Sequence, residues 1–581
     1  MKKNVLWALM LAVGLVSCNN ENEAPEVGGA ASGETTFLSV SLKSAGSMSR
    51  ANSNPESFEY GDENENKVEN ATFYFFDKDG GAYDVATGTN AIVVTAKDLT
   101  KNEETPAENI EAYSKVILVL KGKTATPPAK MVALLNVATP DNYKNKTLSQ
   151  LQALTTDYKT TNGFVMSNSV YKNDLGEVVA TQILPENIFT SPNPTGNEGA
   201  EYAPESDLAN IKPVQIYVER VAAKVRVNVD ATSTTVNVPA DTENGVEAYS
   251  YKIYQVEGAE NTYVKVLGWE VTNAAVTSNL LKDYADTELF TPVNNPTFFR
   301  SYWATTPTTA NPTHNLKFNY FLAENSTAKA VGAEDYYHEN TLTPTNTESS
   351  WFNDLSKSGA TKASQLLVAA QLVDASGAAK EFAKWYGTDY ENGDALKAAM
   401  INNAAKQIFI KDEENSTETE TKYKSIAIGD VVFYQVPAST SYDSNSTEET
   451  QDRRYEVRVK ADASKTYYYV DTEGKVVAYS NADNNKAVSD ILATIEPAMI
   501  WTSGYTYYYT IINHYGDADG IVRNHIYDIN IKKFKGLGTP VYDPEEIIVP
   551  EIPITQEYYH LTAQINVLSW ALVSQEVELG K

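Results

Sequence analysis

The chain has a single cysteine, Cys18, among its 581 residues. One cysteine cannot form an internal disulfide, so packing and hydrogen bonding must stabilise the fold. Its five histidines are also few, and no two of them stand at metal-ligand spacing. They are His314, His338, His514, His525 and His560. The sequence therefore predicts no metal site built on these residue types.

Motifs that carry chemistry are missing as well. There is no glycine-rich phosphate loop, no Gly-x-Ser-x-Gly motif and no nucleophilic cysteine. A glycosidase-like β-protein is the least favoured of three functional hypotheses, because the sequence shows no pair of carboxylates that could carry out the hydrolysis. We therefore expect no catalytic residue and no cofactor, and we do not expect an enzyme.

Basic residues are scarce relative to acidic ones. The chain has 47 Lys and Arg against 76 Asp and Glu, which gives a net charge of −29. Such an acidic surface argues against binding to nucleic acid or to anionic lipid, because both carry negative charge. It is typical of a protein that must stay soluble outside the cell.

The amino terminus predicts a targeting segment over residues 1–18. Two lysines precede the apolar run Val5–Val16, which is too short to span a membrane. Leu-Val-Ser-Cys, ending at Cys18, matches the bacterial lipobox, whose cysteine is acylated after cleavage on its amino side. We expect an outer-membrane lipoprotein precursor that carries palmitate. The alternative is an ordinary signal peptide in which the cysteine is incidental.

The stretch Thr35–Ala51 predicts a strand followed by a cleavage site. Leu38, Val40 and Leu42 alternate with serines, the period of a strand with one buried face. A loose Ser/Gly/Ala/Met stretch then leads to Arg50, the only arginine before Arg220. We expect residues 19–50 to be a propeptide, made of a polar tether and this strand, that is removed by a cut between Arg50 and Ala51.

The rest of the composition predicts an all-β protein. Its 37 tyrosines, with many Thr and Val, favour strands. In Val214–Val229 the apolar positions change phase, which predicts a bend between Glu219 and Lys224 and a passage from one domain to the next. We expect β-sandwich domains over 51–212 and 213–545, with short helices near 148–156, 394–408 and 485–495.

The carboxyl end, residues 546–581, predicts a strand that follows an extended linker. Leu561, Ala563, Ile565 and Val567 alternate with polar residues, and the strand is expected to continue through Trp570. Prolines before it keep the chain extended and prevent regular pairing. Its apolar spacing matches that of the strand expected to be removed.

Three further patterns are considered for a structural and for a functional role. Asp77–Gly81 is expected to be a hairpin turn rather than a calcium loop, and calcium at Asp517 and Asp519 is left open. The tyrosine clusters at 467–469 and 507–509 are expected to be cross-strand neighbours rather than a sugar platform. Two polar inserts within 411–465 are expected to be solvated loops of unassigned role.

Several pieces together resemble the fimbrillins, the subunits of type V pili, and in particular the major shaft subunit of minor-type fimbriae. In order, they are the lipobox at Cys18, FLSVSL with Arg50 after it, KVENATFYFFD, YVERVAAKVRV, LGWEVTN, VRNHIYDINIKKFKGLG and INVLSW. The resemblance implies two tandem transthyretin-like β-sandwiches. It also implies lipoprotein export, removal of the first strand by an arginine-specific protease, and polymerisation by donor-strand exchange.

The implied function is that of a structural subunit of a cell-surface fimbria that supports adhesion and biofilm formation. Expected partners are copies of the chain itself in a head-to-tail filament, anchor and tip subunits, the maturation protease and a host or bacterial receptor. The alternative is a pilus-tip adhesin, or a monomeric surface lipoprotein that binds glycan or host protein. A tip subunit needs no donor strand, so the apolar alternation after residue 560 favours the shaft.

The lipobox generates the first testable prediction. Cells grown with radioactive fatty acid should label the wild-type chain and not the Cys18→Ala variant, because no other cysteine is available for acylation. Equal label in both chains would refute lipidation at this residue.

Overall fold

The computed structural model describes residues 35–45, 59–101, 110–120, 127–170, 181–191, 213–283, 294–341, 364–435, 454–478, 498–541, 547–548, 562–566 and 571–579, with short breaks inside several of these ranges. Most of this part of the chain is strand, in two large mixed sheets and several small ones. The predicted all-β fold class is confirmed. The division into two transthyretin-like domains at the predicted boundaries stays a prediction.

The N-terminal sheet contains the first predicted strand. In spatial order its strands are β3 (Ala91–Thr95), β2 (Asn70–Phe76), β6 (Lys130–Leu135), β10 (Met166–Asn168), β12 (Val214–Arg220), β1 (Thr35–Ala45), β5 (Ile110–Leu120) and β4 (Thr100–Lys101), with β11 (Ile188–Ser191) on β1. Both of its faces are covered, which is why six successive residues of β2 are buried. Phe73 and Phe75 contribute to one core cluster, and Tyr74 and Phe76 contribute to another.

The C-terminal sheet is the larger one. In spatial order its strands are β21 (Glu334–His338), β13 (Ala222–Val229), β35 (His525–Lys535), β15 (Tyr249–Glu257), β16 (Tyr263–Thr272), β23 (Gln365–Val373), β33 (Tyr505–Ile511) and β36 (Thr539–Pro540). β14 (Ser233–Val238) lies on β15, β39 (Ala571–Leu579) lies on β35, and β38 (Thr562–Asn566) lies on β39. Its main core includes Trp269, which is fully buried.

The chain passes between the two sheets at one residue. β12 ends at Arg220 in the N-terminal sheet, and β13 begins at Ala222 in the C-terminal sheet. The amide of Val221, between them, donates to the carbonyl of Val165. The change of sheet falls within the interval where the shift in apolar phase predicted a bend, so that prediction is confirmed.

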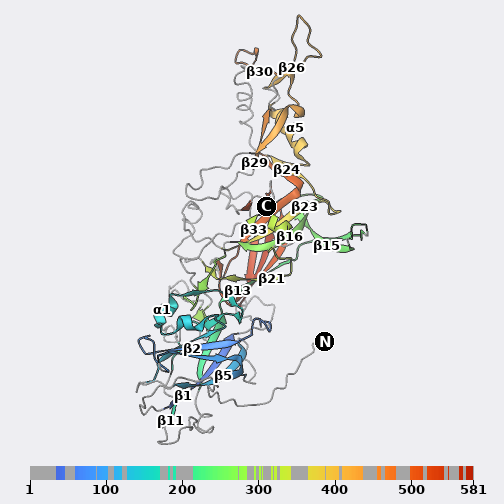
Figure 1. The fold of residues 1–581 in the computed structure, drawn as a ribbon. Coiled ribbons are helices and arrows are strands. Elements are labelled where there is room, and N and C mark those ends of the chain that lie inside the picture. Colours follow the sequence, from blue (N-terminus) through green and yellow to red (C-terminus); the bar gives the residue numbers. More distant parts are fainter. Residues whose placement is uncertain are drawn as a thin grey trace.

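Smaller sheets extend the molecule away from the N-terminal sheet. One contains β25 (Thr388–Tyr390), β24 (Phe382–Trp385), β32 (Ala498–Trp501), β29 (Arg454–Val459) and β28 (Val431–Gln435). Another contains β27 (Tyr423–Ser425), β26 (Phe409–Lys411), β30 (Tyr467–Val470) and β31 (Val476–Ala478). Figure 1 shows β1 and β5 at one end of the molecule, β26 and β30 at the other, and β13 and β21 between them.

Two-residue strands complete the pairing. They are β7 (Thr155–Thr156) with β17 (Ser278–Asn279), β8 (Lys159–Thr160) with β9 (Gly163–Phe164), β18 (Asn294–Asn295) with β19 (Arg300–Ser301), β20 (Leu316–Lys317) with β37 (Ile547–Ile548), and β22 (Asn340–Thr341) with β34 (Gly520–Ile521). The β7–β17 pair joins a segment that lies between β6 and β12 to a segment that follows β16.

The described helices are short. They are α1 (Leu148–Gln152), α3 (Asn319–Leu322) and α5 (Gly393–Ala404), with 3-10 turns at Ala96–Asp98, Pro140–Tyr143, Ile428–Asp430 and Thr502–Gly504. α1 and α5 confirm two of the three predicted helices, and the third, near 485–495, lies outside the described residues. No helix in the described part of the chain is long and apolar enough to cross a membrane.

Three hairpins turn in the same way. An aspartate side chain accepts hydrogen bonds from the backbone amides two and four residues later. The third residue after each aspartate is a glycine with φ between 79° and 86°, a region that other residues rarely adopt. The pairs are Asp77 with Gly80, Asp374 with Gly377 and Asp471 with Gly474. The predicted hairpin turn at Asp77 is therefore confirmed.

The structure locates one of the two polar inserts and the 507–509 tyrosine cluster. Residues 413–422 form the mostly exposed loop of the β26–β27 hairpin, whereas 441–453 lie outside the described residues. Tyr507 and Tyr508 are buried in β33, and Tyr508 packs edge-on against Phe534 at 5.4 Å between ring centroids. The 507–509 cluster therefore lies in the core, as the simpler interpretation predicted.

Candidate assembly site

β1 is an interior strand of the N-terminal sheet. It runs antiparallel to β5 from Thr36 to Ala45 and parallel to β12 from Val40 to Ser44. β11 pairs with its first part, Thr35–Leu38. Removing β1 would therefore separate β5 from β12 and leave a row of unpaired backbone groups on each of them.

The register places the predicted apolar positions opposite core residues. Leu38 lies opposite Leu118, Val40 opposite both Val116 and Val214, and Leu42 opposite Ile216. Those neighbours on β5 and β12 are all buried and belong to one core cluster. Because directly paired residues share a face, the core face predicted from the alternation agrees with the register.

A vacant slot between β5 and β12 would expose this apolar surface. Burying three or four aliphatic side chains stabilises by roughly 5–10 kcal/mol before the entropy of ordering is subtracted. A strand of similar apolar spacing that entered the slot would recover that burial and both hydrogen-bonded ladders. The slot can therefore accept a replacement strand.

The predicted processing residues fall outside the described residues. Cys18, Arg50 and Ala51 lie there, as do Asp517 and Asp519. No group of three or more His, Cys, Asp or Glu side chains in the described part of the chain could hold a metal ion. Asp528, the last position of the calcium pattern left open, lies in β35 and pairs with Arg226.

The carboxyl end forms a hairpin rather than one straight strand. Ala563 and Ile565 lie in β38, which runs antiparallel to β39, so the chain reverses direction between Asn566 and Ala571. Ala571–Leu579 form a separate strand, β39, which pairs with β35 as well as with β38. Leu561, Val567 and Trp570 themselves lie outside the described residues.

β39 holds this hairpin on the C-terminal sheet. It runs parallel to β35, with Val573, Val577 and Leu579 opposite the buried residues Tyr527, Ile531 and Phe534. The residues described for β38 pair with β39 alone, so β38 lies at the edge of the sheet. The apolar alternation of β38 thus belongs to a strand with only one ladder neighbour in the described structure.

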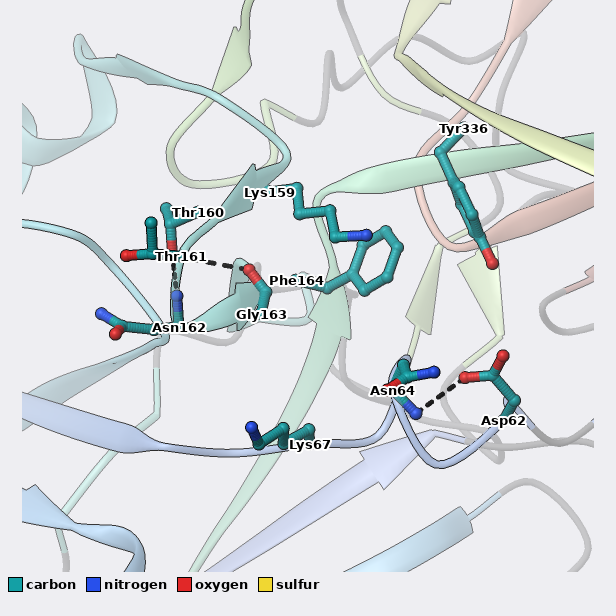
Figure 2. A pocket seen from close by; sticks show the side chains of 10 residues that line it. All are labelled: Asp62, Asn64, Lys67, Lys159, Thr160, Thr161, Asn162, Gly163, Phe164 and Tyr336. Atoms are coloured by element: carbon teal, nitrogen blue, oxygen red, sulfur yellow. Dashed lines mark hydrogen bonds between the residues drawn. The ribbon is translucent and has the colours of Figure 1, made fainter.

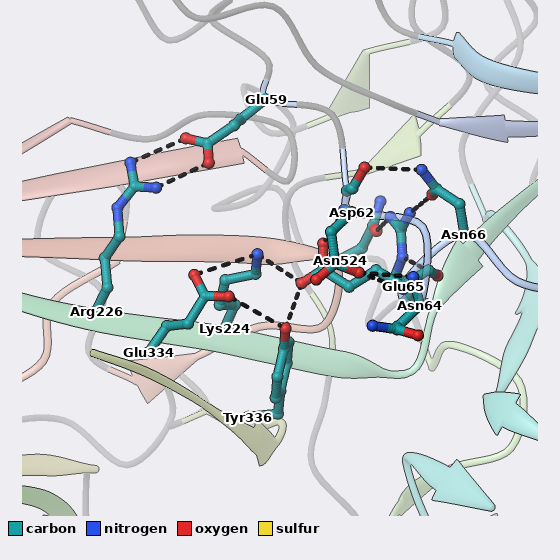
Figure 3. Close-up of polar contacts among 12 residues, drawn as sticks. Glu59, Asp62, Asn64, Glu65, Asn66, Lys224, Arg226, Glu334, Tyr336 and Asn524 are labelled. Carbon is teal, nitrogen blue, oxygen red and sulfur yellow. Dashed lines mark hydrogen bonds and ion pairs between the residues drawn. The ribbon is translucent and has the colours of Figure 1, made fainter. Parts of the chain in front are cut away.

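A short segment ahead of β2, Glu59 with residues 61–66, contacts both large sheets, and we name it the strap. Glu59 accepts two hydrogen bonds from Arg226, at 2.8 and 2.9 Å. Glu65 is fully buried and pairs with Lys224 at 2.5 Å (Figure 3). Burial lowers the pKa of Arg226, but Glu59 and Asp528 outweigh it and raise that pKa overall. Sequence reasoning missed the strap.

A cavity of about 370 Å³ lies beside the strap (Figure 2). Asn64 and Lys67 border it on one side, and Lys159, Asn162 and Phe164 border it on the other. The ammonium of Lys159 already lies 4.8 Å from the centre of the Phe164 ring. Several of the side chains that border it, including Lys67 and Lys159, are exposed, so we assign no ligand to it.

Buried charges continue behind the strap. Arg523 and Glu339, both fully buried, form an ion pair. Lys282 pairs with Glu219 at 3.1 Å, and burial lowers the pKa of this lysine. The Lys282–Glu219 pair joins β12 of the N-terminal sheet to a residue beyond the change of sheet. Removing one partner of such a pair leaves an unpaired buried charge, which is strongly destabilising.

Residues 499–576 match a family model described as the C-terminal region of fimbrillin, the major fimbrial subunit protein type IV. The match includes β33, β35 and β38. No curated protein matches the chain.

Three solved structures are similar to part of this chain. A protein of Parabacteroides distasonis described as a candidate for cell adhesion is 15% identical, with 58% of this chain and 76% of that one covered and a TM-score of 0.30. A fimbrial assembly protein from the same species is 10% identical, with 77% and 100% covered and a TM-score of 0.27. The tip fimbrial protein Mfa3 of Porphyromonas gingivalis is 12% identical, with 58% and 80% covered and a TM-score of 0.24.

The buried histidine His338 generates a prediction about pH. Burial lowers its pKa to about 4, although Asp157 partly opposes the shift. The unfolded chain therefore binds more protons than the folded one between pH 6.5 and 4, and stability falls as the pH falls through this window. The loss should reach roughly 3 kcal/mol.

The measurement is the thermal midpoint of wild type and His338→Gln from pH 7.5 to pH 4.5. Gln can keep a hydrogen bond to Ser278, whose Oγ lies 3.1 Å from the histidine Nδ1. The variant should lose part of the pH dependence. Parallel curves for the two proteins would show that His338 does not titrate in this way.

Proposed function

We propose that the chain is a fimbrillin, because residues 499–576 match the family model for the C-terminal region of fimbrillin, and that it is a structural subunit of the shaft of a cell-surface fimbria. The precursor is exported as an outer-membrane lipoprotein through Cys18. An arginine-specific protease then cuts between Arg50 and Ala51, and β1 leaves with the propeptide. The C-terminal segment of another copy enters the slot that β1 occupied.

One observation carries this proposal. β1 lies between β5 and β12, and its last residue is only five positions before Arg50. A single cut there would detach an interior strand without breaking the chain elsewhere. An interior strand that is separable in this way leaves a slot with two open ladders and an apolar floor, which is what a donor strand requires.

The donor is the segment Leu561–Val567. Its alternation matches that of β1, and its described part, β38, lies at a sheet edge with β39 as its ladder neighbour. Donor and slot lie in different parts of one chain, so each contact is head-to-tail and does not close on itself. Repetition gives a filament of identical subunits, joined at its ends to anchor and tip subunits, that supports adhesion and biofilm formation.

Processing should begin at Arg50. Arg220 is fully buried and Arg226 is engaged by Glu59, so neither offers a protease an exposed loop. Digestion of the native precursor with an arginine-specific endoprotease should give a first large product that begins at Ala51. The Arg50→Lys variant is the control and should resist this cut. A first cut between Arg453 and Arg454 in the wild type would contradict the predicted order.

Assembly should depend on the buried face of the donor. In Ile565→Asp, a charge would have to enter the slot, which costs several kcal/mol. The cleaved variant should form no filaments by negative-stain imaging, while the thermal midpoint of the uncleaved precursor changes little. The matched control is Gln564→Asp, on the other face of β38, which should assemble.

Two outcomes would contradict this assignment. Normal filaments from cleaved Ile565→Asp would exclude this segment as the donor. A large fall in the midpoint of the uncleaved variant would place β38 in the core of its own subunit, and the donor would then lie elsewhere, with Ile547–Ile554 the next segment to test.

A further inference from the structure

The strap is bound to the C-terminal sheet by charged groups that lie away from β1. Two of its three glutamates meet two cations of β13: Glu59 pairs with Arg226, and Glu65 pairs with Lys224. The Tyr336 hydroxyl, from β21, donates to the carboxylate of Glu65 at 2.5 Å. Figure 3 shows these side chains converging from the strap on one side and from β13 and β21 on the other. The strap is therefore attached to two adjacent strands of the C-terminal sheet.

Arg220 binds the strap from the end of β12. Its Nε donates to the carbonyl of Glu65 at 2.9 Å, and its Nη2 donates to the side chain of Asn66. Its Nη1 reaches Asn524 at 3.3 Å. A Cβ at Gly61 would lie 2.6 Å from Arg220 Nη2, so a larger residue there would have to displace the guanidinium. The last residue of β12 thus lies between the strap and the C-terminal sheet.

The other end of the strap is fixed to the N-terminal sheet. Asn136, which follows β6, donates to the carbonyl of Lys67 at 2.7 Å and accepts from the amide of Glu69 at 2.8 Å. β2 begins at the next residue, Asn70. The strap and the residues that follow it therefore bridge the two sheets alongside the direct passage from β12 to β13.

Loss of β1 would change the surroundings of β12 most. β12 has β1 on one side, along Val214–Val218, and β10 on the other, along Val218–Arg220. Without β1, its first half would have no ladder partner among the described strands. At the other end of β12, three attachments would remain. They are the pairing with β10, the continuation of the chain into β13, and the hydrogen bonds of Arg220 to the strap.

We propose that the strap holds β12 in place while the slot is empty, after β1 has left and before the donor strand has entered. This inference rests on the proposed function. The ion pairs of the strap contain no residue of β1, so the cut at Arg50 leaves them intact. The strap also becomes the first described segment of the mature chain, and it stops the loss of β1 from spreading into β2.

The test compares the full precursor with the same protein after cleavage at Arg50. The variants are Glu65→Ala, which removes the buried carboxylate, and the milder Glu59→Gln, which weakens the outer pair. The control is Asp230→Asn, which breaks the surface pair of Asp230 with Lys532. The measurements are hydrogen exchange of the Val214–Arg220 amides, cleavage after the exposed Lys67 by a lysine-specific protease, and the rate of filament growth.

In wild type and Asp230→Asn, protection of Val214–Arg220 should persist after cleavage, and filaments should grow. In the cleaved strap variants, these amides should exchange about tenfold faster or more, since local opening follows the lost free energy. Cleavage after Lys67 should rise and filament growth should slow by a similar factor. In the uncleaved precursors, the same variants should change exchange much less, because β1 still pairs with β12.

The outcomes separate the two proposals. If wild type assembles and both strap variants match it in exchange and growth after cleavage, the role of the strap is refuted while the proposed function stands. Equal loss of protection before and after cleavage would show a general structural role and would also refute the inference. If cleaved wild type does not assemble, the proposed function fails and the inference falls with it.

Discussion

The pairing of β1 on both of its edges is the constraint on which the rest of the structure depends. An interior strand satisfies the backbone of two neighbours at once, so β5 and β12 are complete only while something occupies the space between them. An empty slot combines unpaired amides and carbonyls with exposed apolar side chains, and both penalties favour refilling. In the proposed assembly, the N-terminal sheet stays complete because a strand from another copy of the chain fills the space that β1 leaves.

Under the proposed function, the junction between the sheets has the opposite requirement. Its structure must stay the same when β1 leaves the slot. Its contacts are ion pairs and hydrogen bonds among groups withdrawn from water, including Glu65 with Lys224 and Arg523 with Glu339. Such pairs add little net stability compared with apolar packing, but they are highly specific, since any displaced partner leaves an unpaired charge. Polar groups at the junction thus favour one arrangement of the two sheets, while under the proposed function the apolar slot exchanges one strand for another.

Features with a local period could be predicted from the sequence. The alternation of Leu38, Val40 and Leu42 predicted one apolar face, and the register places these positions opposite buried residues of β5 or β12. The phase change before Lys224 located the passage between sheets. Both follow from the two-residue repeat of a strand. The pairing of β1 with β12 rather than with another strand joins residues far apart in the chain, and no local pattern specifies it.

The strap and the C-terminal hairpin show the limit of such reasoning. Residues 59–66 look like an exposed acidic stretch, and only the arrival of Lys224 and Arg226 from a distant strand makes Glu65 a buried residue. The apolar alternation that begins at Leu561 changes phase before Trp570, and periodicity alone did not predict that the chain turns back to form a hairpin. The reversal arises because β35 offers β39 an open edge, which is a property of the assembled sheet.

The direct passage from β12 into β13 has a mechanical consequence. In a filament of the proposed kind, tension enters a subunit at the slot and leaves through its C-terminal sheet. A strand pulled along its own length loads the hydrogen bonds of its ladder together rather than one after another, which resists far greater force than peeling. From β12 that tension reaches β13 through the covalent backbone, because Val221 is the only residue between the two strands. A fibre built this way would yield by sliding of an inserted strand before its subunits separated into their two sheets.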